Sequence, residues 1–274
     1  MKRAWFVGIL RNLAACVVFG TLTCGTGFAQ SLGTTFSDLW WNPAESGWGV
    51  TVDHQQDVMF LTFFIYRADG SPYWVAALLT RTSASDALPF VFSGDVYEYS
   101  GPYFGGPFNP SLVNNRKVGT AIFSTPYVNS ATLTYTVDGV TVTKSLQRQT
   151  LQNLDFSGVF NGVLNCELSG CANPSQNGQQ IAVGGPITIV QSGGEFQMLF
   201  QPSSNPNNCG FVGSYSQTGS LGSVTGTFSC SEGTKGSFSI TGLQWTIFGM
   251  SGAISAQETG DCAFAGLIGG TGVH

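Results

Sequence analysis

Short runs of apolar or alternating residues, each followed by Gly, Asn, Asp or Pro, recur along the chain and constrain its fold most strongly. Residues 48–54 alternate, whereas residues 58–66 and 73–79 are apolar almost throughout. No window of about eleven residues or more keeps apolar positions at helical spacing without interruption by Gly, Pro or β-branched residues. The pattern predicts an all-β protein built from antiparallel meanders, as barrels or sandwiches.

Turn residues place two hairpins in the first half of the chain. Asp69-Gly70 separates two apolar runs, and Asp138-Gly139 separates two alternating ones. Glycine accepts the positive φ of such tight turns. From Phe156 onward the composition changes to small residues with repeated Gly-x-aromatic steps, which suit tightly curved sheets. We therefore predict a Trp-rich β domain at residues 30–150, a linker at 151–154 and a Gly-rich β domain at 155–274.

The first 29 residues predict export. Lys2, Arg3 and Arg11 form a basic start, residues 13–22 are almost wholly apolar, and Gly27-Phe28-Ala29 fits a cleavage site. We interpret residues 1–29 as a signal peptide and expect a secreted or periplasmic protein. Lipoprotein processing at Cys16 is the less favoured alternative. No later apolar run approaches the roughly 20 residues of a spanning helix, so we expect no transmembrane helix.

Charge excludes several partners. Removing residues 1–29 takes three of the ten basic residues and none of the fifteen acidic ones, which leaves a net charge of −8. Nucleic acids and anionic lipids demand a basic surface, so neither is expected as a partner. The sequence contains no calcium loop, phosphate loop or dinucleotide fingerprint, and we expect no cofactor and no metal site.

Five cysteines follow residue 29, all in the second half of the chain, which predicts a disulfide-stapled C-terminal domain. If Gly219-Ser220 is a two-residue turn, Cys209 faces Cys230, Phe211 faces Phe228, Gly213 faces Gly226 and Tyr215 faces Val224. We therefore predict a Cys209–Cys230 disulfide.

The other three cysteines leave two pairings open. Cys171 lies near the start of the second domain and Cys262 near its end, so their disulfide would tie the first strand to the last. Cys166–Cys171 is the alternative pairing. We favour Cys171–Cys262, which leaves Cys166 as a free thiol.

The densest aromatic cluster is Leu-Trp-Trp-Asn-Pro-Ala-Glu-Ser-Gly-Trp-Gly at residues 39–49. The candidate ligand-binding residues are Trp40, Trp41, Glu45, Trp48 and Trp74. Two interpretations stand. The rings could fill the end of a sheet as core, or ring faces and a carboxylate could line a groove for a sugar or another flat apolar ligand. Adjacent residues in a strand point to opposite sides, so Trp40 and Trp41 need not share a role.

This segment resembles a group of uncharacterised secreted proteobacterial proteins that share Trp-Trp-Asn-Pro-x-Glu-Ser-Gly-Trp-Gly. The resemblance is specific over residues 38–79 and loose to about Arg148. The second half, around Cys171 and from Cys209 to Cys230, looks like another module of similar exported proteins. The resemblance implies export and β structure, and it transfers no activity and no functional residue.

Histidine scarcity argues against most enzymes. His274 is the last residue, so His54 is the remaining candidate for a catalytic triad, and its neighbours form no motif. Carboxylate pairs among Glu45, Asp53, Asp95 and Glu98 would suit a carbohydrate-active hydrolase, which is the alternative function. We favour a non-enzymatic binding or surface-assembly module, whose partner is a glycan, another flat apolar ligand or another surface protein.

Overall fold

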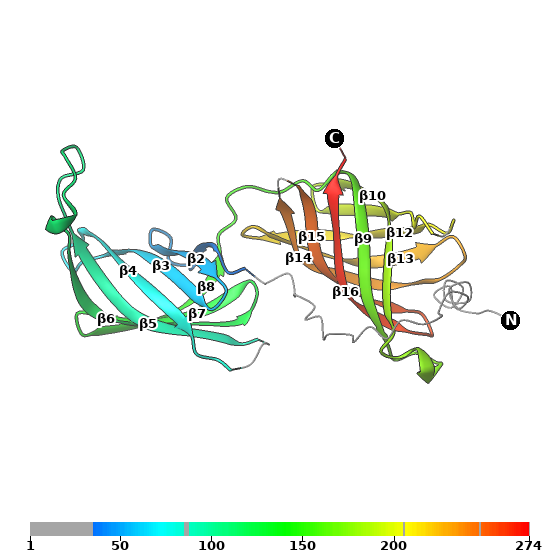
Figure 1. Cartoon of the computed structure of the whole chain (residues 1–274), viewed down its shortest axis with the longest axis horizontal. Coiled ribbons are helices and arrows are strands. Elements are labelled where there is room, and N and C mark those ends of the chain that lie inside the picture. Colours follow the sequence, from blue (N-terminus) through cyan, green and yellow to red (C-terminus); the bar gives the residue numbers. More distant parts are fainter. Residues whose placement is uncertain (1–34, 85–87, 205, 247, 274) are drawn as a thin grey trace, which may run out of the picture. The chain divides into compact units, whose positions relative to one another are not determined.

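The computed structural model describes residues 35–84, 88–204, 206–246 and 248–273. It contains two closed antiparallel barrels of eight strands each (Figure 1). The all-β prediction is thus confirmed, in the form of barrels and not of sandwiches. The predicted signal peptide, with Cys16, lies outside the described residues. Among the described helices, none is long and apolar enough to cross a membrane.

Barrel 1 is an up-and-down meander that closes when its first strand pairs with its eighth. Its elements are β1 (Asp38–Trp41), β2 (Gly49–Gln55), β3 (Val58–Tyr66), β4 (Pro72–Arg81), β5 (Phe90–Ser100), η1 (Pro110–Leu112), β6 (Asn114–Tyr127), β7 (Ser130–Val137) and β8 (Val140–Arg148). Both predicted hairpin turns are present, at Gly70 between β3 and β4 and at Asp138-Gly139 between β7 and β8. All three residues have positive φ.

Large side chains fill the inside of barrel 1. Trp40, Phe63, Phe92 and Phe123 are fully buried, and the Trp40 ring meets the Phe123 ring edge-on at 5.3 Å. The indole N–H of Trp40 donates to the Phe36 carbonyl oxygen at 2.9 Å, so its polar atom is satisfied. A filled interior makes this barrel a packed core and not an open calyx.

A buried arginine packs against this core. Arg148, at the end of β8, pairs with Asp38 at 3.2 Å and donates to the backbone carbonyls of Val128 and Thr35. Its guanidinium also lies 4.9 Å from the centre of the Trp40 ring. Burial lowers the pKa of Arg148, and its hydrogen bond to Asp38 opposes that shift. The charge is tolerated because its donors have partners.

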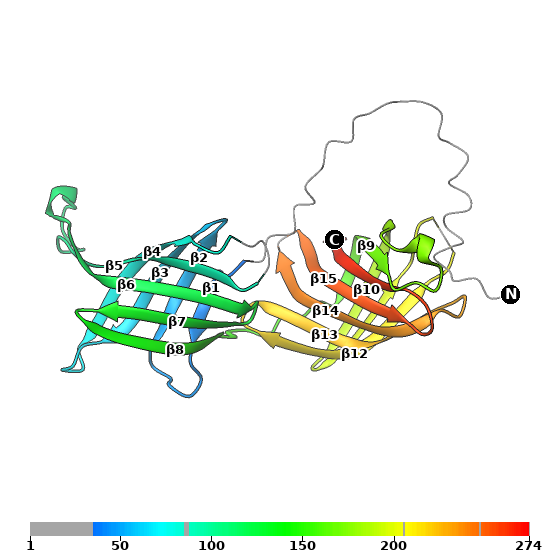
Figure 2. The same ribbon diagram turned by 90° about the horizontal axis from the view of Figure 1, so that it is seen from below.

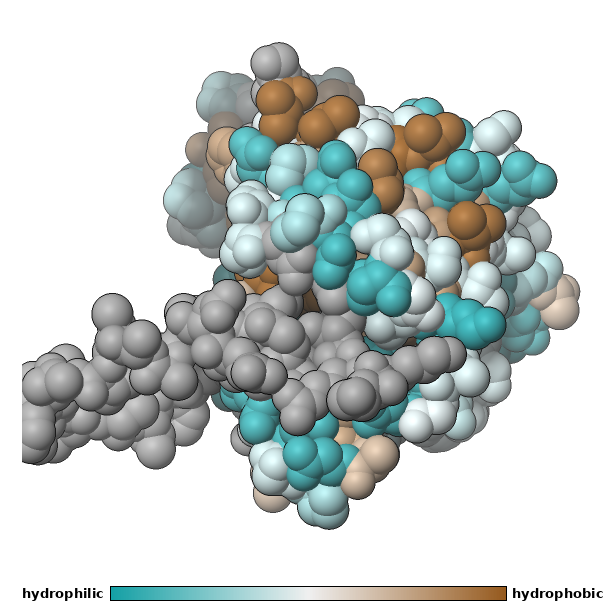
Figure 3. Space-filling model, turned by 90° about the vertical axis from the view of Figure 1, so that its right-hand side faces the viewer, coloured by the Kyte–Doolittle hydropathy of each residue, from teal (hydrophilic) through white to brown (hydrophobic). Residues whose placement is uncertain are grey.

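Barrel 2 has the same meander order and closes when its first strand pairs with its last (Figure 2). Its elements are β9 (Gly158–Ser169), η2 (Pro174–Gln176), β10 (Gln180–Ser192), β11 (Glu195–Phe200), β12 (Cys209–Thr218), β13 (Leu221–Cys230), β14 (Lys235–Thr246), β15 (Gly249–Glu258) and β16 (Ala263–Gly272). In the view of Figure 3, hydrophobic residues stand in separate patches among hydrophilic ones.

Two disulfides staple barrel 2, as predicted: Cys209–Cys230 joins neighbouring strands, and Cys171–Cys262 joins segments 91 residues apart. The alternative Cys166–Cys171 pairing is therefore wrong. Cys166 is free and buried, and burial raises the pKa of its thiol to about 12. Such a thiol is inert, since the thiolate is the reactive form.

The predicted register of the β12–β13 hairpin agrees with the contacts across it. Phe211 stacks on Phe228 with ring centres 5.6 Å apart. A Cβ added at Gly226 would collide with the Val212 backbone and with Gly213. Only glycine permits this backbone approach, which explains why small residues face each other here.

Candidate functional site

The five candidate residues of the tryptophan segment do not converge on one groove. Trp40 is fully buried in the core of barrel 1. Trp41 is half-buried, and its indole nitrogen has no hydrogen-bond partner among the described residues. Trp48 packs against the core and contacts Glu45. Trp74 lies elsewhere, on the outer side of β4, with 53% of its surface exposed.

Glu45 joins Trp48 to β8. One carboxylate oxygen, Oε2, accepts from the indole N–H of Trp48 at 2.9 Å and from the ammonium of Lys144 at 2.7 Å. Lys144 also lies 5.4 Å from the centre of the Trp48 ring. The hydrogen bond from Lys144 holds the pKa of Glu45 below its usual value, with a smaller contribution from Trp48. Glu45 is therefore an ionised partner in a closed set of contacts.

The contacts among Glu45, Trp48 and Lys144 connect the β1–β2 segment to β8 where β1 and β8 are not paired. β1 has only four residues and pairs with β8 at Gln147 and Arg148, so the earlier part of β8 has no partner in β1. Lys144 on β8 pairs with the buried Leu133 on β7, so the Lys144 side chain points inward. There it contacts Glu45, which lies in the connection between β1 and β2. The geometry supports the structural interpretation of Trp40, Glu45 and Trp48.

Trp74 belongs to a row of exposed rings that crosses three strands. Phe64 on β3 pairs directly with Trp74 on β4, and half of the Phe64 surface is exposed, at 50%. The Tyr99 ring on β5 is nearly parallel to that of Trp74, with an interplanar angle of 9° and centres 6.1 Å apart. Neighbouring strands lie about 4.8 Å apart, so these three aromatic side chains lie side by side on the outer side of the sheet.

Further apolar side chains extend this row along the same outer side. Leu78 pairs with Phe60, and Tyr97 covers Ala76 and lies 6.4 Å from the Tyr99 ring. We call the set the aromatic face: Phe60, Phe64, Trp74, Leu78, Tyr97 and Tyr99. The sequence held one signal for it, because residues 58–66 are apolar on both sides of a strand whose inner side alone faces a core.

Charged side chains on β5 and on the segments beside it are paired within barrel 1. Asp95 accepts from Lys117 at 2.7 Å. Glu98 accepts from Arg67 at 2.8 Å and from Arg116 at 2.7 Å, and Arg116 also pairs with an aspartate of the β7–β8 turn. The face therefore offers ring surfaces and hydroxyl groups, with its neighbouring charges already compensated.

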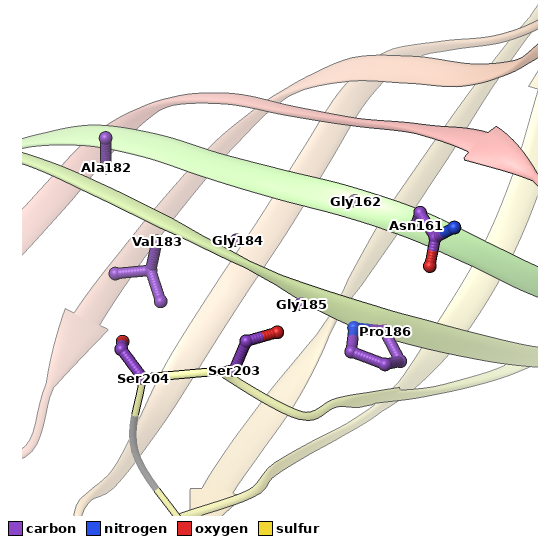
Figure 4. A pocket seen from close by; sticks show the side chains of 9 residues that line it. All are labelled: Asn161, Gly162, Ala182, Val183, Gly184, Gly185, Pro186, Ser203 and Ser204. Carbon is purple, nitrogen blue, oxygen red and sulfur yellow. The ribbon is translucent and has the colours of Figure 1, made fainter.

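Barrel 2 has a pocket of about 610 Å³ between β9, β10 and the connection that follows β11 (Figure 4). Gly162, Gly184 and Gly185 give it a lining of bare backbone, and Ser203 and Ser204 border it. None of the residues that line it is charged. Such a lining offers little to fix or activate a ligand.

Two acidic side chains of barrel 2, Asp261 and Glu258, were also considered as possible site residues. Asp261 lies beside the sulfurs of Cys171 and Cys262, but a disulfide supplies no thiolate ligand for a metal. Glu258 is buried on the inner side of β15, and one of its oxygens has no partner among the described residues. Burial, with the nearby charges of Asp261 and Glu232, raises its pKa to about 7.

His54 has backbone partners on both ring nitrogens. Its Nδ1 accepts from the backbone N–H of Phe36 at 3.4 Å, and its Nε2 lies 2.7 Å from the carbonyl oxygen of Gln56. Burial lowers the pKa of His54. A neutral, backbone-held imidazole is a structural group.

Comparisons with protein-family models, with curated proteins and with solved structures found no match to this chain.

Proposed function

We propose that the protein is an exported binding module, secreted or periplasmic, that holds a neutral glycan against the aromatic face of barrel 1. The observation that carries this proposal is the row formed by Phe64, Trp74 and Tyr99, three neighbouring aromatic side chains on adjacent strands. Sugar rings present flat apolar faces that stack on such rings, and their hydroxyls bond to polar groups at the edge. The two disulfides support an oxidising compartment.

The electrostatics around the face favour a neutral ligand. Asp95 and Glu98 are already ion-paired, as are the basic residues that contact them. A charged ligand would have to displace these partners, whereas a neutral glycan needs only ring stacking and hydrogen bonds.

The same pairing favours binding over hydrolysis. Glycoside hydrolysis needs one carboxyl group as acid and a second as base or nucleophile. Of the four carboxylates considered for that role, Glu45, Asp95 and Glu98 are held by lysine or arginine. Asp53 lies exposed on β2.

Binding of the purified protein to insoluble cellulose, chitin and xylan tests the proposal. We expect retention by at least one of them, and a roughly tenfold loss of affinity in Trp74→Ala, the equivalent of about 1.4 kcal/mol. Trp245→Ala is the matched control, because Trp245 is an exposed tryptophan of barrel 2 with 45% of its surface exposed. Equal retention of the Trp74 variant and the wild type would exclude the aromatic face.

A further inference from the structure

The connection between β5 and β6 carries three strongly exposed aromatic side chains, and one of them, Phe104, is the most exposed aromatic residue that the described ranges contain. Tyr103, Phe104 and Phe108 are 72%, 92% and 68% exposed, and Leu112 is 54% exposed. We call residues 101–113 the tip loop. It extends past the ends of the neighbouring strands of barrel 1 (Figures 1 and 2). Exposing these apolar side chains to water is unfavourable, and such exposure is typical of a surface that binds a partner.

The tip loop is held in shape by its own hydrogen bonds. Gly106 donates to the Tyr103 carbonyl at 3.2 Å, and Val113 donates to that of Pro110 at 3.1 Å. Asn109 accepts from both the backbone N–H and the hydroxyl of Ser111. The exposed rings are therefore presented on a defined turn structure.

The tip loop contains few groups that need to be hydrated. Residues 101–113 contain no Asp, Glu, Lys or Arg, and prolines at 102, 107 and 110 have no N–H donor. Backbone groups that enter a bilayer must be satisfied internally, which the loop achieves in part through the bonds described above. Aromatic side chains are favourable at the boundary between head groups and acyl chains.

We propose that the tip loop inserts Tyr103, Phe104 and Phe108 into the interface of a lipid bilayer and so docks barrel 1 on a membrane surface. The lipid must be net-neutral at the contact, because the loop brings no cation and the chain is acidic, with 15 acidic against 10 basic residues. A projecting, uncharged and convex loop suits a lipid interface, which accepts apolar groups without matching hydrogen bonds. This inference is independent of the glycan proposal, which rests on the outer side of β3, β4 and β5.

Sedimentation with phosphatidylcholine vesicles tests the inference. We expect the protein to sediment with the vesicles at both 0.05 and 0.5 M NaCl, values of about one third and about three times physiological ionic strength. The double variant Phe104→Ser with Phe108→Ser should lose partitioning at least about tenfold. Val140→Ser is the matched control, since Val140 is 65% exposed at the start of β8, next to the β7–β8 turn, and it should sediment like the wild type.

A Phe104→Trp variant gives a direct readout of insertion. Its added fluorescence should shift to shorter wavelength with vesicles and be quenched by brominated phosphatidylcholine. Failure of the wild type to sediment would overturn the inference, as would unchanged sedimentation of the double variant. Sedimentation only with phosphatidylglycerol vesicles, lost in 0.5 M NaCl, would overturn it as well. Loss of polysaccharide retention in the double variant, with vesicle binding intact, would assign the loop to the glycan instead.

Discussion

The two barrels share one topology but are stabilised differently. Barrel 1 fills its interior with large rings such as Trp40, Phe63 and Phe123 and has no disulfide among its described residues. Barrel 2 also has aromatic side chains in its core, and it adds close backbone approaches at glycines and two disulfides. The comparison shows that the same meander is stable with packed rings alone in one barrel and carries additional covalent links in the other. The exposed rings also differ, because barrel 1 carries the aromatic face and the tip loop, whereas the exposed rings of barrel 2 include Trp245 and Phe248 near the β14–β15 turn.

The largest difference we expect between the barrels is their response to reduction. Closing loops with sequence separations of 91 and 21 residues stabilises barrel 2 by about 4–5 and about 3 kcal/mol in the chain-entropy model. Calorimetry with a reductant should therefore lower the transition of barrel 2 and leave that of barrel 1 in place. A single transition that shifts as a whole would contradict the division into two stabilising strategies.

Within barrel 1, the two sides of the wall should respond differently to loss of a tryptophan. Trp40→Ala should cost about 3–5 kcal/mol, because it opens a cavity in the core and removes a ring contact of Arg148. Trp74→Ala should cost less than about 1 kcal/mol, since its ring is half exposed. Chemical denaturation of both variants checks this. Equal losses would mean that Trp74 is part of the core and not of a binding surface.

Barrel 2 should have a pH dependence that originates in Glu258. Its pKa is about 7 in the folded protein, above the ordinary value of 4.5, so the folded state binds the proton more tightly than the unfolded state. The stabilisation is complete below pH 4.5 and is lost as the pH rises to about 7. Glu258→Gln should therefore raise stability by about 1–2 kcal/mol at pH 8 and change it little at pH 4. Melting curves at the two pH values measure this, and an equal effect at both would exclude titration of Glu258.

Local turn chemistry made much of the fold predictable. Asp138-Gly139 and Gly219-Ser220 fixed two hairpins, and the register of the second placed Cys209 opposite Cys230. Barrel closure could not be predicted, because the pairing of β1 with β8 and of β9 with β16 joins residues far apart in sequence. No local pattern distinguishes such a pairing from the edge of a sandwich.

The candidate site was less predictable than the fold. The tryptophan segment drew attention to Trp40 and Trp48, yet one fills the core and the other is tied to Glu45 and Lys144. The row of Phe64, Trp74 and Tyr99 depends on cross-strand register, which joins residues from three strands. Sequence spacing alone does not bring Tyr99 beside Trp74.

Hydroxyl-radical footprinting with cellohexaose, chitohexaose and xylohexaose tests the central claim most directly, since it maps which side chains a bound glycan covers. For at least one of the three sugars, we predict protection of Phe64, Trp74 and Tyr99, with Trp245 of barrel 2 unchanged. Protection confined to barrel 2, or no protection by any of the three sugars at saturating concentration, would contradict the assignment of glycan binding to the aromatic face.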